Sequence, residues 1–133
     1  MDMPLPATAQ GLLDAWARGN VLAPDCPSRP VLQHLTNRWG TLAMIVLSTG
    51  THRFGALRRK IGGVSERMLA QTLHALEGDG MVRRVALDVV PPHVEYSLTP
   101  LGAEAAEHVV ALASLIETRL PQILTAHRPA QTA

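Results

Sequence analysis

The sequence of 133 residues predicts a mainly helical domain with one small antiparallel β-hairpin, an α+β fold. Apolar residues recur at helical spacing along most of the chain, and capping residues and glycines separate the helical stretches. Two of these stretches meet at Gly62-Gly63, which is the pattern of a helix-turn-helix. Two alternating stretches, 81–87 and 94–98, then predict paired strands joined by a projecting loop. A helix-turn-helix followed by such a hairpin is a winged helix-turn-helix, and this is the fold class that the sequence predicts.

Composition indicates a single domain and excludes several classes of protein. Hydrophobic residues make up 47% of the chain, which is enough for one core. The longest apolar run, 42–47, is too short to span a bilayer, so we expect no membrane segment. The N-terminus lacks a basic start followed by a long apolar run, so we expect no secretion signal. The single cysteine excludes an intrachain disulfide and is compatible with a reducing cytoplasm, where we expect the protein to act.

Charge is unevenly distributed along the chain. The formal net charge is only +1, yet residues 52–84 hold seven Lys and Arg against three Asp and Glu. The rest of the chain holds five Lys and Arg against eight Asp and Glu. A basic middle between acidic ends is what a local phosphate-binding face requires, although a solvated charged surface would look the same.

The first 49 residues are predicted to hold two helices and a linker. We expect residues 1–7 to be disordered and Thr8 to cap a short helix over 9–18. Residues 21–30, with three prolines, predict a linker. The strongly apolar stretch 31–49 predicts one helix that is buried on most of its surface and bent near Gly40. The short first helix has an apolar face that needs a partner, and this face holds Leu12, Leu13 and Trp16.

The next two helices form the predicted helix-turn-helix. Residues 53–61 predict a short helix with an apolar inner face and an outer face rich in cations. Residues 64–80 predict the recognition helix, which Ser65 caps and which Gly78 and Gly80 end. Its inner stripe consists of Leu69, Leu73 and Leu76.

The outer face of the recognition helix predicts base contacts. Arg67 can donate a bidentate pair to guanine, and Gln71 can form one with adenine. Some of the polar side chains on this face could instead only meet solvent. The remaining candidates on this helix are Ser65, Met68, Thr72 and His74.

A second group of side chains suits phosphates, which position a protein on DNA without reading its sequence. These residues lie on the first helix of the pair and on the hairpin. Residues 88–93 join the two strands as a loop, the wing. The predicted phosphate contacts are Arg53, Arg58, Arg59, Lys60, Arg84 and His93.

The last predicted helix follows a domain that is already complete. Thr99 can cap it, Pro100 suits its first turn, and Pro121 is predicted to kink or end it near Leu120. Within one chain, few residues remain that could cover the apolar stripe of this helix. Pairing with the same helix of a second subunit, with help from the helix over 9–18, is the economical solution. The stripe consists of Ala105, Val109, Leu112, Ile116 and Leu120.

These elements divide the chain into four predicted parts. Residues 1–25 are an N-terminal extension with a short dimerisation helix, and 26–100 are the winged helix-turn-helix domain. Residues 101–127 form a C-terminal dimerisation helix, and 128–133 are a disordered tail.

Over roughly residues 26–116 the chain resembles the HxlR-type winged helix regulators, relatives of the MarR group. The resemblance rests above all on two blocks, Leu73-x-x-Leu76-Glu77-x-Asp79-Gly80-Met81-Val82-x-Arg84 and Pro91-Pro92-x-Val94-Glu95-Tyr96-x-Leu98-Thr99-x-x-Gly102. It also includes Cys26-Pro27, Trp39 and Arg53-Phe54. Residues 1–25 exceed the usual lead-in, and Pro30 departs from the family pattern.

The resemblance implies a homodimeric bacterial or archaeal transcription regulator of a short, roughly palindromic operator in double-stranded DNA. It implies that the helix capped by Ser65 enters the major groove. The wing at 88–93 would lie along the backbone or in the minor groove.

Cys26 is the candidate for an effector site. In some members of the family the equivalent cysteine senses oxidants or electrophiles, and a cysteine beside a helix N-terminus has its thiolate favoured. Asp25 opposes this by like-charge repulsion. With no second cysteine, oxidation could yield only an intersubunit disulfide, a mixed disulfide or an adduct. The alternative is a small, partly buried structural residue.

Other chemistry is weakly indicated. Trp16 and Trp39 could line a small-molecule pocket at a dimer interface, but two core tryptophans are the simpler interpretation. The six histidines show no ligand spacing, so we expect no metal and no cofactor. No phosphate loop, paired-carboxylate site or nucleophile elbow is visible, so we do not expect an enzyme.

Three functions remain from the sequence. The prediction is a dimeric DNA-binding transcription regulator that responds to Cys26 chemistry or to a small ligand. The alternative is a winged helix that binds proteins and has no DNA activity. The third is an architectural DNA binder without sequence preference.

Overall fold

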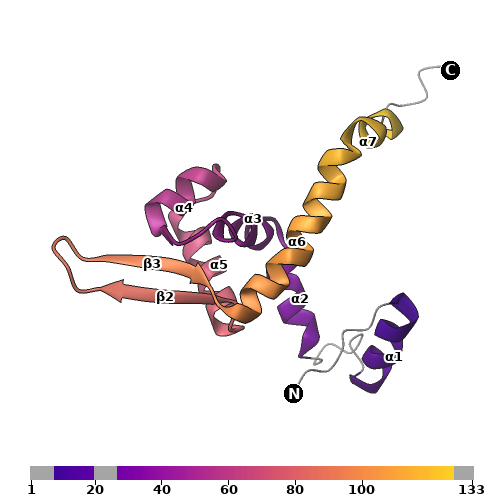
Figure 1. The fold of residues 1–133 in the computed structure, drawn as a ribbon, viewed down its shortest axis with the longest axis horizontal. Helices are drawn as coiled ribbons and strands as arrows, with labels where there is room; N and C mark the ends of the chain where they lie inside the picture. The colour runs from indigo at the N-terminus through magenta and orange to yellow at the C-terminus, as the bar shows by residue number, and fades with distance from the viewer. Residues whose placement is uncertain (1–7, 20–26, 128–133) are drawn as a thin grey trace.

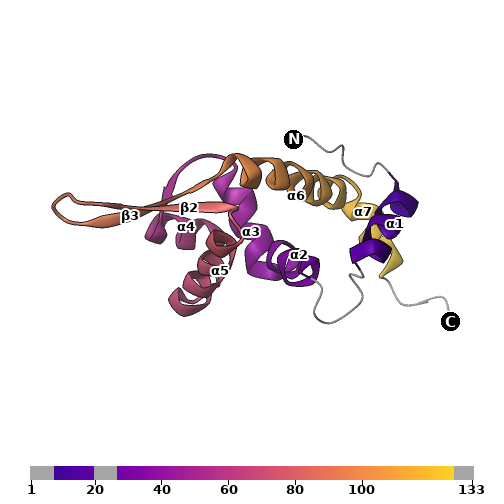
Figure 2. The same cartoon turned by 90° about the horizontal axis from the view of Figure 1, so that it is seen from below.

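The computed structural model describes residues 8–19 and 27–127. Over this part of the chain, helices surround a small sheet from which a long hairpin projects, and a helical arm leaves in another direction (Figures 1 and 2). In chain order the elements are α1 (Ala9–Gly19), α2 (Ser28–Thr36), α3 (Arg38–Leu47), β1 (His52–Arg53), α4 (Phe54–Ile61), α5 (Glu66–Gly78), β2 (Val82–Leu87), β3 (His93–Leu98), α6 (Pro100–Thr118) and α7 (Leu120–Ala126).

The core lies where α3, α4, α5 and the sheet meet the first turns of α6. Its side chains are mostly aliphatic, with Tyr96 as the buried aromatic residue and Trp39 packed against its edge. Burial of these side chains supplies the main stabilisation of the domain. The largest fully buried side chains come from α3, α4 and α5 and are Met44, Leu57, Leu69, Leu73 and Leu76.

The sheet has three antiparallel strands in the order β1-β3-β2. Strands β2 and β3 form the predicted hairpin, with Val82 opposite Leu98 at the base and Leu87 opposite His93 near the tip. Strand β1 was not predicted. Arg53 was expected to begin a helix, but it lies in β1 opposite Glu95. It is also the N-cap residue of α4. Two residues are too few to show an alternating pattern. His93, expected in the loop, is the first residue of β3.

The prediction of one helix over 31–49 is wrong. The structure has two helices, α2 and α3, and the break is at Asn37 rather than at Gly40. The Asn37 side-chain oxygen accepts hydrogen bonds from the backbone N–H groups of Trp39 and Gly40, at 3.0 and 2.8 Å, and so caps α3. Gly40 is needed for close approach, because a Cβ atom there would overlap the carbonyl oxygen of His34.

Two further expectations for this region are corrected. Residues 28–30 belong to α2 rather than to a linker, because a proline in the first helical turn removes no intrahelical hydrogen bond. Helix α2 has no buried residue, whereas α3 buries Gly40, Ala43, Met44 and Leu47. The segment is therefore not buried on most of its surface.

Three predicted N-caps are confirmed. Thr8 accepts a hydrogen bond from the backbone of Gly11, Ser65 from Met68 and Thr99 from Gly102, at 3.0, 3.0 and 2.9 Å. These caps fix the first turns of α1, α5 and α6.

The predicted C-terminal helix is bent. Helix α6 ends at Thr118, α7 begins at Leu120 with Pro121 in its first turn, and the two are bent by 63°. The break near Pro121 is confirmed, and a single helix over 101–127 is not. Within the described residues no single helix is long and apolar enough to cross a membrane; only the bent pair α6–α7 meets that requirement jointly.

Several expectations fall outside the described residues. They are the disorder of residues 1–7 and 128–133, most of the linker over 21–30, and the placement of Cys26.

Candidate nucleic-acid interface

Helix α5 has one buried face and one exposed face. Leu69, Leu73 and Leu76 are buried in the core, as their spacing predicts. Four of the predicted DNA contacts on this helix are exposed, namely Arg67, Met68, Gln71 and His74. The exposed face therefore presents hydrogen-bond donors and acceptors together with one thioether.

Thr72 does not belong to this exposed face. Its exposed fraction is only 8%, and its hydroxyl donates a hydrogen bond of 2.8 Å to the carbonyl oxygen of Met68. The prediction that Thr72 reaches DNA is corrected on this ground. Thr72 lies at the edge of the apolar stripe, where a short side chain is covered by its neighbours.

The turn before α5 brings two helices into close contact. Gly62 and Gly63 have φ angles of 71° and 76°, a region that side-chain-bearing residues rarely adopt. Arg58 secures the turn from α4, because its Nε donates to the carbonyl oxygen of Val64 at 3.0 Å. Its guanidinium also lies 3.5 Å from the Glu66 carboxylate. Arg58 thus positions the N-terminus of α5, in addition to its predicted role towards phosphate.

A groove of about 710 Å³ follows this turn. It is lined by residues of α4, the glycine turn and the capped end of α5, including Arg58, Arg59 and Ser65. Backbone N–H groups at a helix N-terminus and nearby guanidinium groups both favour negative charge. Glu66 also lines the groove and lies beside Arg58, so the charge that favours a phosphate group there comes chiefly from Arg59 and the backbone N–H groups.

A second groove, of about 460 Å³, lies between the start of α4 and β3. Arg53, Arg59 and His93 are among its lining residues. The Nε2 atom of His93 lies 3.5 Å from a Glu95 carboxylate oxygen but has no hydrogen-bond partner. Arg59 lines both grooves, so its position suits a backbone that runs from α5 towards the wing.

Lys60 is held in a different way from the two arginines before it. Its ammonium group lies 2.8 Å from Nε2 of His52, and Nδ1 of His52 lies 2.7 Å from the carbonyl oxygen of Gly50. An ammonium group can only donate a hydrogen bond, and a carbonyl oxygen can only accept one. These contacts fit a buried imidazole that donates from Nδ1 to Gly50 and accepts at Nε2 from Lys60. Lys60 is exposed and makes this internal contact, and its phosphate contact stays a prediction.

Arg83 and Arg84 lie in β2, and both are exposed. The sequence predicts that at least one of the two points outward. Strand β2 is at one edge of the three-stranded sheet. The predicted contact Arg84 lies opposite Tyr96, near the middle of the hairpin.

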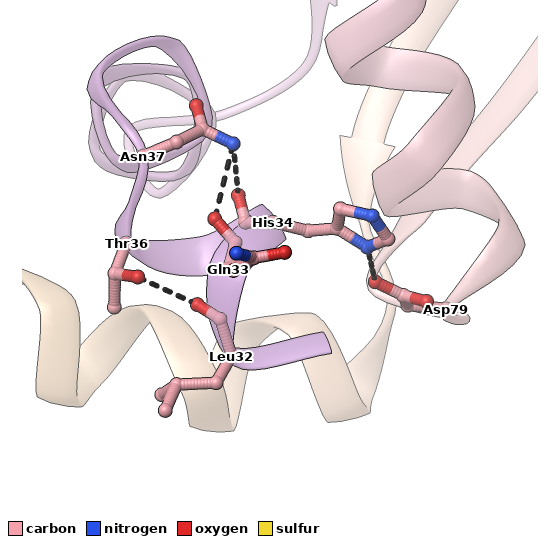
Figure 3. A network of polar contacts seen from close by, with 6 residues as sticks. All are labelled: Leu32, Gln33, His34, Thr36, Asn37 and Asp79. Carbon is pink, nitrogen blue, oxygen red and sulfur yellow. Dashed lines mark hydrogen bonds and ion pairs between the residues drawn. The ribbon is translucent and has the colours of Figure 1, made fainter. Parts of the chain in front are cut away.

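An ion pair that the sequence does not reveal joins α2 to the end of α5. Nδ1 of His34 lies 2.6 Å from a carboxylate oxygen of Asp79, the residue that caps the C-terminus of α5 (Figure 3). The two residues are 45 positions apart, so no local pattern could indicate the contact. Figure 3 shows His34 on the turn of α2 that precedes the break at Asn37.

Metal binding receives no support from the part of the chain that the structure describes. Over residues 8–19 and 27–127 no group of three or more His, Cys, Asp and Glu side chains could hold a metal ion.

A capped, exposed helix after a tight glycine turn, flanked by cationic grooves and a β-hairpin, defines a winged helix-turn-helix DNA-binding regulator of transcription. Residues 34–123 match the model of the HxlR-like helix-turn-helix family, and the chain belongs to that family.

Relatives of known name agree with this assignment. The chain is 63% identical over 106 residues to YtfH of Escherichia coli strain K12, an uncharacterized HTH-type transcriptional regulator, covering 80% of this chain and 84% of YtfH. The solved structure of ytfH from Salmonella typhimurium is 61% identical, with a TM-score of 0.77, covering 81% of this chain and 96% of that one.

A more distant neighbour is the redox regulator HypR in its oxidized form. It is 33% identical, with a TM-score of 0.64, covering 70% of this chain and 96% of HypR. These relatives are described as regulators rather than as enzymes.

Proposed function

We propose that the protein is a sequence-specific regulator that binds a palindromic operator as a homodimer. The observation that carries the proposal is the exposed face of α5, where Arg67 and Gln71 are exposed on a helix whose first-turn residues are exposed as well. A helix of this kind fits the major groove, and these two side chains can pair with guanine and adenine edges.

The cationic grooves beside α5 supply the affinity that does not depend on sequence. Arg58 and Arg59 line the groove at the start of α5, and Arg53 and Arg59 line the groove towards the wing. Each phosphate contact releases a counterion, so operator binding is expected to weaken steeply as salt rises. Specificity would then come from Arg67 and Gln71 on α5.

The homodimer is supported by the apolar side chains that one chain leaves uncovered on α6. Leu112 and Leu115 are each 56% exposed and Ile116 is 47% exposed. Figure 1 shows this arm extending away from the winged domain. Two copies joined along it would present two α5 helices to two half-sites, which is how twofold proteins read palindromes.

The test is binding to a duplex selected from a random library by the full-length protein. We expect Arg67→Ala and Gln71→Ala each to lower specific affinity about 10-fold or more, and to relax the preference at one base position. Arg67→Lys is the matched control: it keeps the charge, and with it the salt dependence, but loses the bidentate pair.

Three results would contradict the proposal in different ways. Selection that enriches no sequence, with equal competition by any duplex, would indicate an architectural binder. Failure to bind any duplex at low salt would indicate a protein-interaction module. Unchanged affinity in both Arg67 variants would show that α5 is not the element that recognises the DNA sequence.

We further propose that oxidation of Cys26 controls operator binding. Support comes from the likeness to HypR, which is described as a redox regulator, and from Cys26 being the single cysteine of the chain. The product would be an intersubunit disulfide, a mixed disulfide or an adduct. An oxidant such as diamide is expected to reduce operator affinity of the wild type and to leave Cys26→Ser unaffected. Equal loss in both proteins, or none in either, would leave ligand binding as the alternative switch.

A further inference from the structure

The cationic part of the chain begins before the helix-turn-helix. Residues 27–65 contain six Lys and Arg and no Asp or Glu, so α2, α3 and α4 carry positive charges and no acidic residue. Four of the six cations lie within 53–60, at the start of α4 or on it. A fifth is Arg38, the first residue of α3, which lines neither of the two cationic grooves.

The stability of α3 does not account for Arg38. A cation in the first turn of a helix opposes the positive end of the helix dipole. The side chain is exposed, and none of the ion pairs found over residues 8–19 and 27–127 includes it. Its charge is therefore left available to a molecule outside the chain.

The guanidinium group of Arg38 is nevertheless held in place. Its central carbon lies 4.5 Å from the centroid of the Trp39 ring, which is a cation–π contact. The turn that carries both residues is fixed by Asn37, whose side chain caps α3 and donates to the carbonyl oxygen of Gln33 at 3.0 Å (Figure 3). A side chain that is ordered before binding loses less conformational freedom when it meets a ligand.

The Trp39 ring connects Arg38 to the glycine turn. Helix α3 packs against both α4 and α5. A Cβ atom added to Gly63 would lie 4.0 Å from Cη2 of Trp39, and Gly63 lines the groove at the start of α5 together with Arg58 and Arg59. One indole ring therefore lies between Arg38 and the groove that favours a phosphate group.

We propose that Arg38 is a further phosphate contact, made from α3 to the DNA backbone that passes the start of α5. The proposal rests on the proposed DNA-binding function and adds a third helix to the interface. A planar guanidinium that stacks by its face on an indole ring keeps its N–H edge free to donate to phosphate oxygens. Such a contact positions the protein on the duplex and reads no base.

The experiment measures the salt dependence of binding to the selected duplex and to a scrambled duplex of equal length, with the full-length protein. Arg38→Gln is expected to lower the salt slope by about one, and the affinity about 5- to 10-fold at about 0.1 M salt. The fold loss should be the same for both duplexes, whereas the loss of a base contact, as in Arg67→Ala, falls on the selected duplex. Arg38→Lys keeps the charge and should keep the wild-type slope.

Arg119→Gln is the matched control, because it removes an exposed arginine at the end of α6, outside the helix-turn-helix. It should leave the salt slope at the wild-type value. Equal losses in Arg38→Gln and Arg119→Gln would overturn the proposal, since they would show an effect of net charge rather than a local contact. A less stable Arg38→Gln with an unchanged slope would also overturn it, because the stack on Trp39 would then serve the fold alone.

The same data separate this proposal from the proposed function. Wild-type binding and slope in Arg38→Gln would refute the contact and leave the regulator intact. Failure of the wild type to bind any duplex would refute the proposed function itself.

Discussion

Gly102, in the first turn of α6, packs closely against the backbone of Met81, the residue that precedes β2. A Cβ atom at this position would overlap the carbonyl oxygen of Met81 and approach its backbone carbon. Because backbone cannot move aside as a flexible side chain can, we expect Gly102→Ala to destabilise the fold by about 2 kcal/mol.

Gly78, at the end of α5, is the matched control because an added Cβ atom would meet nothing within 4 Å. Gly78→Ala is expected to stabilise the protein by about 0.5 kcal/mol through helix propensity. Equilibrium urea unfolding of both variants tests this contrast. Similar changes in both variants would show that close approach is not what requires Gly102.

Adjacent cations on α4 differ in what they can offer to DNA. The ammonium group of Lys60 lies 2.8 Å from Nε2 of His52, whereas Arg59 lines both grooves beside α5. We expect Arg59→Gln to lower the salt slope of operator binding by about one and Lys60→Gln to leave it unchanged. Fluorescence anisotropy over a salt series measures both slopes. Equal losses would mean that Lys60 leaves His52 in the complex.

At the scale of elements, α2 is held to the domain through one side of its surface and through the His34–Asp79 ion pair. The helix has no fully buried residue, while Val31 and Leu35 pack against the core. The ion pair joins it to the C-terminal end of α5 (Figure 3). A short, charge-assisted contact between elements distant in sequence restrains α2 and α5 together.

A double-mutant cycle with His34→Gln and Asp79→Asn measures this coupling. Each single change is expected to cost about 1 kcal/mol, and the double change little more than either, with a coupling energy of about 1 kcal/mol. Strictly additive losses in urea unfolding would show that the two side chains contribute independently. His34→Gln is also expected to weaken operator binding only as far as it loosens α5.

At the scale of the whole molecule, the C-terminal arm formed by α6 and α7 has apolar side chains that one chain leaves uncovered. Leu112 and Ile116 on α6 are exposed. We expect Leu112→Lys combined with Ile116→Lys to yield a monomer, because two buried charges would oppose pairing. Loss of the second half-site should lower operator affinity about 100-fold or more.

Light scattering coupled to size exclusion measures the mass, and anisotropy measures the affinity. Thr118→Lys, an exposed polar position on the same helix, is the control and should stay dimeric. A double variant that remains dimeric would place the interface elsewhere, and a monomer with full operator affinity would contradict the need for two half-sites.

The local features of the chain could be predicted well. Thr8, Ser65 and Thr99 cap helices as predicted, because a capping side chain bonds to backbone only two or three residues away. The stripe of Leu69, Leu73 and Leu76 is buried because helical spacing alone places all three on one face.

Features that depend on distant residues could not be predicted. The pairing of β1 requires a strand more than 40 residues later, at Tyr96 and Glu95. The His52–Lys60 contact needs β1 and α4 in place, and the burial of Thr72 depends on what packs over the edge of α5. The break at Asn37 has a local cause, but the continuous apolar pattern around it concealed the capping role.

The sequence by itself therefore determined the class of fold, the position of α5 and the family. The fold class and the position of α5 follow from spacing, caps and glycines, which act within a few residues of one another, and the family follows from the resemblance of the blocks 73–84 and 91–102. Only the tertiary structure decided which polar side chains are engaged within the chain, because His34, His52 and Thr72 meet partners or neighbours only once the helices and sheet are assembled. It also decided that Val89 and Val90 in the loop of the hairpin are exposed, since exposure is a property of the assembled surface.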